Sequence, residues 1–185
     1  MQLTIHTLDS APDASRPLLE GIAADLGLVP NMAATIAESP ILLGVFDALR
    51  RGVASTGLDP VHREAVGLAV SVAVDNAYGV AFHSMVLGRL GVTDAEIAAI
   101  QSGGLPSEPV CAAVCGFATE VVLTRGKVDP ATVDVLLGAG LTREGLLEIV
   151  AECTFAGMIG VVDNLAGRVV LDDFLAQPAH GHLTP

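Results

Sequence analysis

The sequence has no tryptophan, one tyrosine and five phenylalanines, although 51% of its 185 residues are hydrophobic. A core of this composition is built from Ala, Val, Leu and Ile, which favours closely approaching helices over aromatic-rich β-sandwiches. Strand-like alternation is also scarce, because apolar residues recur at spacings of three and four. We therefore predict an all-α protein that folds as a compact helical bundle.

Basic residues are few: nine Lys and Arg stand against 21 Asp and Glu, giving a net charge of −12. A negative protein repels nucleic acid and anionic membranes, so neither is expected as a partner. With only 16% charged residues, part of the apolar surface is expected to be covered by another subunit. The composition thus predicts a homo-oligomer.

Long apolar runs are missing too. The longest, Ala65–Val74 and Ala77–Phe82, are separated by Asp75 and Asn76 and fall short of the roughly 20 residues that a membrane span needs. The start, MQLTIHTLDS, has no basic region and no long apolar stretch, so no signal peptide is predicted. We expect a cytoplasmic protein.

Three cysteines, Cys111, Cys115 and Cys153, make no disulfide framework. The first two have the i,i+4 spacing of a helix, where a disulfide would be strained. We expect reduced, buried thiols that pack as small hydrophobic groups.

No metal site or cofactor is predicted. His180 and His182 have a metal-compatible spacing, but the terminal segment around them offers no further ligand. His62 is expected to be solvated in a first helical turn. The Gly103-Gly104 pair lacks the lysine of a phosphate-binding loop.

The apolar periodicity predicts helices near 14–26, 31–38, 40–55, 60–75, 77–90, 94–101, 107–125, 130–138, 143–165 and 169–176. Asp59-Pro60 and Asp129-Pro130 each place a capping oxygen before a proline at the first helical position. The segment 102–109, SGGLPSEP, is the best candidate for a linker.

The most informative pattern is Glu-x11-Asn-x2-Gly-x3-His, from Glu64 to His83. It resembles the signature of the alkylhydroperoxidase / carboxymuconolactone decarboxylase family, in which Glu-x11-Cys-x2-Cys-x3-His is usual. Glu64, Tyr78 and His83 match that signature. Asn76 and Gly79 stand at its two cysteine positions, so the thiol pair that reduces peroxides in the redox members is missing.

The resemblance covers about residues 20–170 and implies an alkylhydroperoxidase-like bundle that forms homo-oligomers. Two segments about 80 residues apart also resemble each other. They are REAVGLAVSVAVDNAYGVAFH from Arg63 and REGLLEIVAECTFAGMIGVVD from Arg143. We predict one domain, residues 1–185, made of two similar helical halves at about 14–101 and 107–176. In the redox members, the glutamate and the histidine form a proton relay beside the thiols.

One unbroken helix would hold Glu64 and His83 about 28 Å apart. Asp75 and Asn76 predict a break, because both residue types compete with helical backbone bonds. If Asn76 caps a new helix, then Asn76, Gly79 and His83 share one face, which turns back toward Glu64. We predict that Glu64 and His83 come within direct or one-water hydrogen-bond reach.

In the resulting pocket, burial is expected to raise the pKa of Glu64 and to suit it for acid–base catalysis. His83 is expected to shuttle protons. Asn76 is a candidate donor to a carbonyl or enolate oxygen, and Gly79 is expected to leave room where a sulfur would be. Tyr78 lies off this face and is expected either to pack or to contact the substrate at an edge, without a catalytic role.

Three functions remain open. The first is a thiol-independent acid–base enzyme that acts on a small organic acid, lactone or carbonyl compound. The second is the family's peroxidase activity, which needs a thiolate that the motif lacks. The third is a non-catalytic descendant that binds a ligand or only assembles, in which Glu64 and His83 form a buried structural pair.

Overall fold

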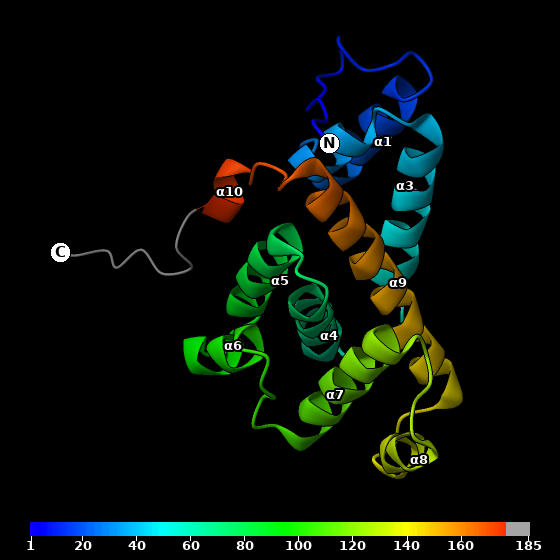
Figure 1. Ribbon diagram of the computed structural model, residues 1–185, viewed down its shortest axis with the longest axis vertical. Helices are drawn as coiled ribbons and strands as arrows, with labels where there is room; N and C mark the ends of the chain where they lie inside the picture. The colour runs from blue at the N-terminus through cyan, green and yellow to red at the C-terminus, as the bar shows by residue number, and fades with distance from the viewer. Residues whose placement is uncertain (177–185) are drawn as a thin grey trace, which may run out of the picture.

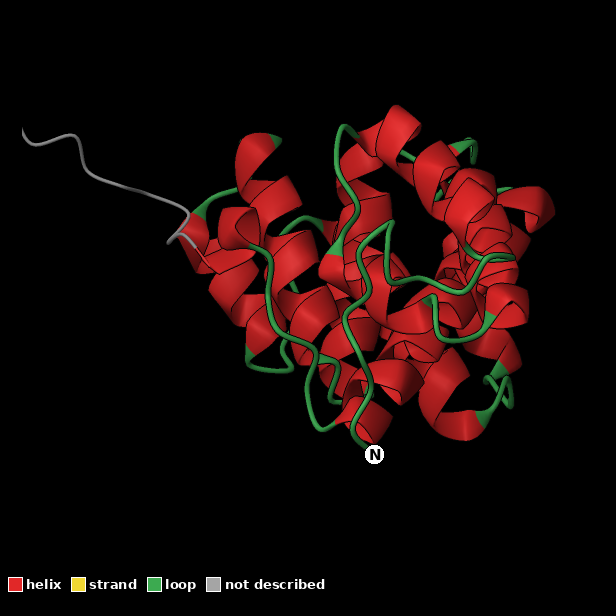
Figure 2. Cartoon of the chain, turned by 90° about the horizontal axis from the view of Figure 1, so that it is seen from above, coloured by secondary structure: helices red, strands yellow, loops and turns green. Residues whose placement is uncertain are grey.

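The computed structural model describes residues 1–176, within which ten helices and no strand are found (Figures 1 and 2). The helices are α1 Arg16–Leu26, α2 Asn31–Ile36, α3 Pro40–Ala54, α4 Pro60–Ala73, α5 Ala77–Arg89, α6 Asp94–Gln101, α7 Pro109–Thr124, α8 Pro130–Gly138, α9 Arg143–Ala166 and α10 Asp173–Ala176. The all-α prediction is confirmed, and the first nine helices begin and end within two residues of their predicted bounds.

The prediction for the last helix, 169–176, is wrong at its start. Arg168 has a left-handed backbone with φ 82°, which interrupts any helix that follows α9 directly. The carboxylate of Asp172 then accepts hydrogen bonds from the backbone N–H of Asn31 and from the Tyr78 hydroxyl. These contacts tie the segment before α10 to α2 and α5.

The proline-led starts of α4 and α8 form as predicted. Asp59 accepts hydrogen bonds from the backbone N–H groups of Val61 and His62. Asp129 does the same for Ala131, at 2.9 Å. In both cases a carboxylate satisfies N–H groups that lack partners inside the helix.

Helix α4 lies in the middle of the bundle, with α5, α7 and α9 packed against it (Figure 1). The longest helix, α9, also contacts α3 and α5, and the N-terminal helices α1–α3 gather at one of its ends. The predicted division into two halves remains a prediction. Helix α9 of the second half packs directly on α3, α4 and α5 of the first.

Among the described residues, α9 is the one helix long and apolar enough to cross a membrane by length and composition alone. Along its length it also buries residues from Leu146 to Asp163 inside the bundle. One such helix is weak evidence for a membrane span, because the core helix of a soluble protein meets the same criteria, and a cytoplasmic location remains an expectation.

The break between α4 and α5 is the feature that positions the site. Asp75 adopts a left-handed backbone with φ 55°, and Asn76 caps α5 by accepting a hydrogen bond from the backbone N–H of Gly79 at 2.8 Å. The buried carboxylate of Asp163 on α9 accepts a second bond, from the N–H of Ala77. The two helices therefore fold back on each other as predicted.

Candidate functional site

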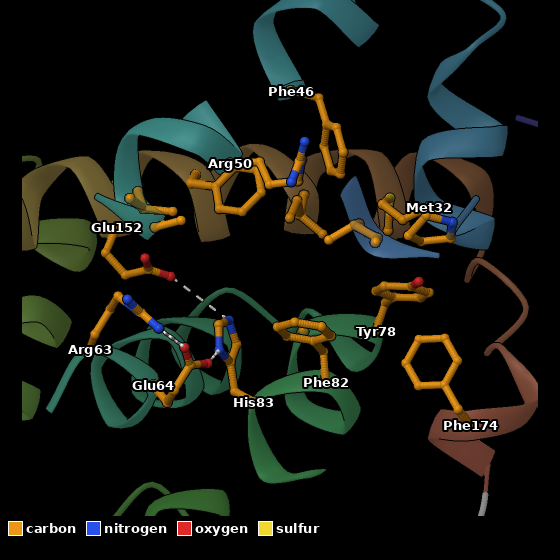
Figure 3. Close-up of a pocket in the computed structure, with 17 residues that line it drawn as sticks. Met32, Phe46, Arg50, Arg63, Glu64, Tyr78, Phe82, His83, Glu152 and Phe174 are labelled. Carbon is orange, nitrogen blue, oxygen red and sulfur yellow. Dashed lines mark hydrogen bonds and ion pairs between the residues drawn. The ribbon is translucent and has the colours of Figure 1, made fainter. Parts of the chain in front are cut away.

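Glu64 on α4 and His83 on α5 meet across this hairpin. The His83 Nδ1 atom lies 2.9 Å from Glu64 Oε2, and the two residues are 8% and 6% exposed (Figure 3). Nineteen residues separate them in sequence, so the contact depends entirely on the break at Asp75. The prediction that these two side chains meet is confirmed.

Glu64 is also held by its neighbour in sequence. The guanidinium of Arg63 donates from Nε and Nη2 to Glu64 Oε1, at 3.1 and 3.0 Å. Burial raises the pKa of Glu64, but the hydrogen bond from His83 and the Arg63 charge outweigh it and hold the pKa below its ordinary value. The expected rise was wrong, because the sequence did not show how fully the carboxylate is paired.

A second carboxyl group, Glu152 on α9, faces the same imidazole from the other side. Its Oε1 atom lies 3.9 Å from His83 Nε2, beyond direct hydrogen-bond reach (Figure 3). Glu152 is 3% exposed, and burial raises its pKa, with the nearby Glu64 carboxylate adding to the rise while His83 and Arg63 oppose it. We did not predict Glu152. The sequence feature that could have identified it is an acidic residue within the apolar segment IVAECTFAG.

These four side chains close one end of a cavity of about 260 Å³. Its remaining walls are mainly apolar and come from six helices, α1, α2, α3, α5, α9 and α10; they include Met32, Phe46, Phe82, Phe155, Ile159 and Phe174 (Figure 3). Arg50 also reaches the cavity, but its guanidinium is paired with Asp25 and Asp47. The site is thus an apolar chamber with a polar end.

Tyr78 and Gly79 line this chamber, whereas Asn76 is not among the lining residues. The Asn76 amide donates instead to Ser71 Oγ and to the backbone carbonyl of Ala156, at 3.4 and 3.3 Å. The expected role of Asn76 toward a substrate oxygen does not fit this geometry, because its polar atoms serve the helix junction.

The room expected beside Gly79 is also filled. A Cβ atom at position 79 would lie 2.3 Å from Ser71 Oγ and 2.4 Å from Asn76 Nδ2. The Asn76 amide therefore occupies the space that a side chain at position 79 would need. Tyr78 contributes its ring to the cavity wall, and its hydroxyl donates to Asp172, away from the polar end.

None of the three cysteines, all of which lie in the described part of the chain, lines the cavity. All three are free and buried, as predicted. Burial and the nearby Glu152 carboxylate raise the pKa of Cys153 to about 12, and hydrogen bonding and burial raise that of Cys115 further. These two thiols are poor sources of a reactive thiolate, whereas the hydrogen bond with Cys115 lowers the pKa of Cys111, which lies outside the cavity.

A separate cluster lies where α4 and α7 begin. Ligand atoms of His62, Glu108 and Cys111 fall within 4.8 Å of one another. His62 is not simply solvated as expected, because its Nε2 atom lies 3.2 Å from Glu108 Oε2. His180 and His182 lie outside the described residues.

The sequence model of the carboxymuconolactone decarboxylase family matches residues 40–120, which include the whole Glu64–His83 pattern. No match was found among curated proteins. Several solved structures are similar in fold, three of which follow. A peroxidase-related protein with an alkylhydroperoxidase AhpD core, from Ralstonia eutropha JMP134, is 24% identical with a TM-score of 0.80, covering 94% of this chain and 93% of that one.

An uncharacterized peroxidase-related protein from Silicibacter sp. TM1040 is 18% identical with a TM-score of 0.78, over 96% of this chain and 94% of that one. A cysteine-to-alanine variant of the debrominase Bmp8, in complex with 2,3,4-tribromopyrrole, is 19% identical with a TM-score of 0.75, over 95% and 94%. These likenesses establish an alkylhydroperoxidase-like fold. Residues 40–120 thus match the carboxymuconolactone decarboxylase family model, within a chain that has the alkylhydroperoxidase-like fold.

Proposed function

We propose that this protein is a thiol-independent acid–base enzyme that moves protons on a small, mainly apolar carbonyl compound, lactone or organic acid. The observation that carries the proposal is the position of His83. Its imidazole lies between the paired carboxylate of Glu64 and the buried carboxyl of Glu152, at the polar end of an apolar cavity.

The contact with Glu64 sets which nitrogen of His83 carries the proton. Glu64 receives donors from Arg63 on one oxygen and contacts His83 Nδ1 with the other, so a carboxylate that accepts both bonds fits the geometry. Nδ1 then donates, and a neutral imidazole keeps a lone pair on Nε2. The lone pair is directed toward the cavity side where Glu152 lies. His83 is therefore suited to act as a general base.

Glu152 supplies the matching acid. Its pKa is raised chiefly because burial disfavours the charged form, so the group tends to keep its proton. The 3.9 Å between His83 Nε2 and Glu152 Oε1 is too long for a direct hydrogen bond. A substrate oxygen near Glu152 and a C–H bond near Nε2 would use both groups at once.

The proposed step is enolisation. Nε2 of His83 takes a proton from the carbon next to a carbonyl, and the C–H electron pair forms the enol double bond. The carbonyl π electrons move to oxygen, which receives the proton of Glu152. His83 becomes an imidazolium paired with Glu64, and Glu152 becomes a carboxylate. In a substrate with a double bond next to the deprotonated carbon, the His83 imidazolium then returns its proton to the far carbon of that double bond. The enol O–H returns its proton to Glu152, so the carbonyl, the neutral imidazole and the carboxylic acid are restored and the double bond has moved.

The cavity limits the substrate. At about 260 Å³ it lies just below the range of about 300–1,000 Å³ that is usual for small-molecule sites. Its aromatic and aliphatic walls suit an apolar body of one small ring, with a single polar group directed toward His83. The complex of the debrominase Bmp8 variant with 2,3,4-tribromopyrrole, on the same fold, supports a small ring as the class of ligand.

A thiol peroxidase is less well supported. The peroxidase-related relatives suggest that activity, but here the motif positions hold Asn76 and Gly79, and no cysteine lines the cavity in the described residues. A non-catalytic binding protein would have the same cavity but would catalyse no proton transfer. The decisive test therefore has to separate binding from proton transfer.

That test is deuterium exchange. The protein is incubated in D2O with a panel of small cyclic ketones, lactones and keto acids, and NMR follows the C–H groups beside the carbonyl. We expect catalysed exchange for at least one compound. We also expect His83→Ala and Glu152→Gln each to slow it by about 100-fold or more. Glu144→Gln, an exposed position on the same helix, is the matched control and should keep the rate.

NMR shift changes would show which compounds bind in the cavity. If compounds bind but none shows catalysed exchange, the acid–base enzyme is rejected and the non-catalytic binding protein remains. Hydroperoxide turnover with a dithiol reductant, lost in Cys115→Ser, would instead establish the peroxidase.

A further inference from the structure

The cluster of His62, Glu108 and Cys111 contributes nothing to the cavity, yet it joins three side chains of metal-binding type from two helices. His62 lies in the first turn of α4, Glu108 precedes α7, and Cys111 lies in the first turn of α7. One nitrogen, one oxygen and one sulfur atom fall within 4.8 Å of one another.

The fold fixes this arrangement at both helix starts. Asp59 caps α4 and accepts from the backbone N–H of His62, while Glu108 caps α7 and accepts from the N–H groups of Val110 and Cys111. Because α4 and α7 pack directly on each other, the two capped ends lie side by side. The His62 Nε2 atom already lies 3.2 Å from Glu108 Oε2.

We propose that His62, Glu108 and Cys111 form a binding site for one divalent transition-metal ion of the Zn²⁺ or Co²⁺ type. An imidazole, a carboxylate and a thiolate are the donors that Zn²⁺ prefers, whereas Mg²⁺ and Ca²⁺ take oxygen ligands. A tetrahedral ion with bonds of about 2.0–2.3 Å needs ligand atoms about 3.3–3.8 Å apart. The His62–Glu108 pair nearly meets this spacing, and small side-chain rotations would bring Cys111 to it.

Access and charge favour a cation here. The Cys111 side is buried, whereas the Glu108 and His62 side chains are 54% and 26% exposed, so an ion can enter from solvent. Water would complete the tetrahedron on that side. The carboxylates of Asp59 and Glu96 also act electrostatically on the Cys111 thiol, which adds negative potential around the site.

Binding would release one proton from Cys111, since a metal-bound cysteine is a thiolate. The site is separate from the chamber around His83, because none of its three ligands lines that cavity. The inference is therefore independent of the proposed enzymatic function.

Cobalt provides a direct test. The full chain, freed of metal by chelation, is titrated with Co²⁺ while the near-ultraviolet absorption of a thiolate–cobalt bond is recorded. We expect this band to saturate at one ion per chain and to disappear when Zn²⁺ is added. Cys111→Ala should abolish the band, and His62→Ala and Glu108→Gln should each weaken Co²⁺ binding by about tenfold or more.

Two controls make the result specific. Cys153→Ala removes a buried thiol from α9 and should leave the band unchanged. A His180→Ala/His182→Ala variant should also keep it, which excludes the terminal histidines as ligands. No thiolate–cobalt band at excess Co²⁺, or a band that persists in Cys111→Ala, would overturn the proposal. If Cys111→Ala fails to fold by circular dichroism, the His62→Ala titration decides.

Discussion

The His83 imidazole occupies the space beside Gly67 where any other residue would carry its side chain. A Cβ atom at Gly67 would lie 2.2 Å from His83 Cε1 and 2.5 Å from Nε2. The absence of a side chain on α4 thus lets the ring of α5 lie flat against the helix and reach Glu64. Gly67 is a positioning residue for the site, although it makes no polar contact in it.

Gly67→Ala should therefore displace His83. We expect a loss of about 1–3 kcal/mol in the free energy of unfolding, because the added methyl group overpacks a buried contact. The rate of catalysed deuterium exchange should also fall, because the His83 imidazole moves away from Glu64. Urea denaturation measures the first effect, and the imidazole NMR signals of His83 report the second.

Gly116 on α7 provides the matched control, since a Cβ atom there would meet nothing within 4 Å. Gly116→Ala should raise stability by about 0.5–1 kcal/mol, because alanine is the better helix former. Equal effects of the two substitutions would show that the space beside Gly67 does not fix His83.

Glu152 predicts a particular dependence of stability on pH. Its pKa in the folded protein lies above the ordinary value of 4.5, mainly because the group is buried. Between those two values the folded state keeps a proton that the unfolded chain releases, so raising the pH favours unfolding. The stability that Glu152 contributes is complete below pH 4.5 and is lost as the pH rises through the folded pKa.

Relative to Glu152→Gln, the wild-type protein should therefore become steadily less stable as the pH rises from about 4.5. Urea denaturation at a series of pH values gives the difference between the two proteins. The same series on Glu144→Gln corrects for the removal of one negative charge from the helix. A difference that grows in favour of the wild type with rising pH would contradict the assignment.

The close approach of Asn76 to Gly79 predicts coupling between these positions. Gly79→Ala should destabilise the protein, because the new methyl group would meet the Asn76 amide and Ser71 Oγ. Asn76→Ala should cost about 1 kcal/mol through the lost helix cap. In the double variant the methyl group at position 79 has more room, so the combined cost should fall short of the sum by about 0.5 kcal/mol or more.

Urea denaturation of the four proteins measures this difference. Strictly additive losses of unfolding free energy would show that Ser71, and not Asn76, blocks a side chain at position 79. Coupling would also mean that a cysteine introduced only at position 79 should destabilise this chain.

The sequence was sufficient for the first nine helices and for the meeting of Glu64 and His83. Helix periodicity, proline positions and capping residues are local signals, and Asp75-Asn76 marked the turn that folds α5 back on α4. Once that turn is known, the spacing of three and four residues places His83 on the inner face. These inferences need only the neighbours of each residue in the chain.

Glu152 and the environment of Asn76 needed the tertiary structure. Glu152 comes from a helix some 70 residues beyond His83, and nothing in its local sequence shows which face of α9 meets the imidazole. The Asn76 amide donates a hydrogen bond to the backbone carbonyl of Ala156, which also lies on α9. Likewise, the lowered pKa of Glu64 depends on how Arg63 and His83 share its two oxygens.

The outer face of α9 bears on the predicted homo-oligomer. Leu147, Val150, Val161 and Leu165 are 71%, 37%, 65% and 52% exposed. The intervals between them along the chain are 3, 11 and 4 residues, each close to a whole number of helical turns. All four side chains therefore lie along one side of the helix. An apolar stripe of this kind, interrupted by the exposed Thr154, suits contact with a second copy of the chain.

We accordingly predict that the protein self-associates through this stripe, with an interface well over about 1,000 Å². Light scattering at micromolar concentration should give a multiple of the 18.8 kDa chain mass. The Leu147→Glu/Val161→Glu variant should shift the protein toward a single chain, because two charges would be desolvated in the contact. Leu123→Glu, at a leucine of α7 that is 64% exposed, should leave the mass unchanged. A wild-type mass near 18.8 kDa would mean that solvent covers the stripe and that no oligomer forms.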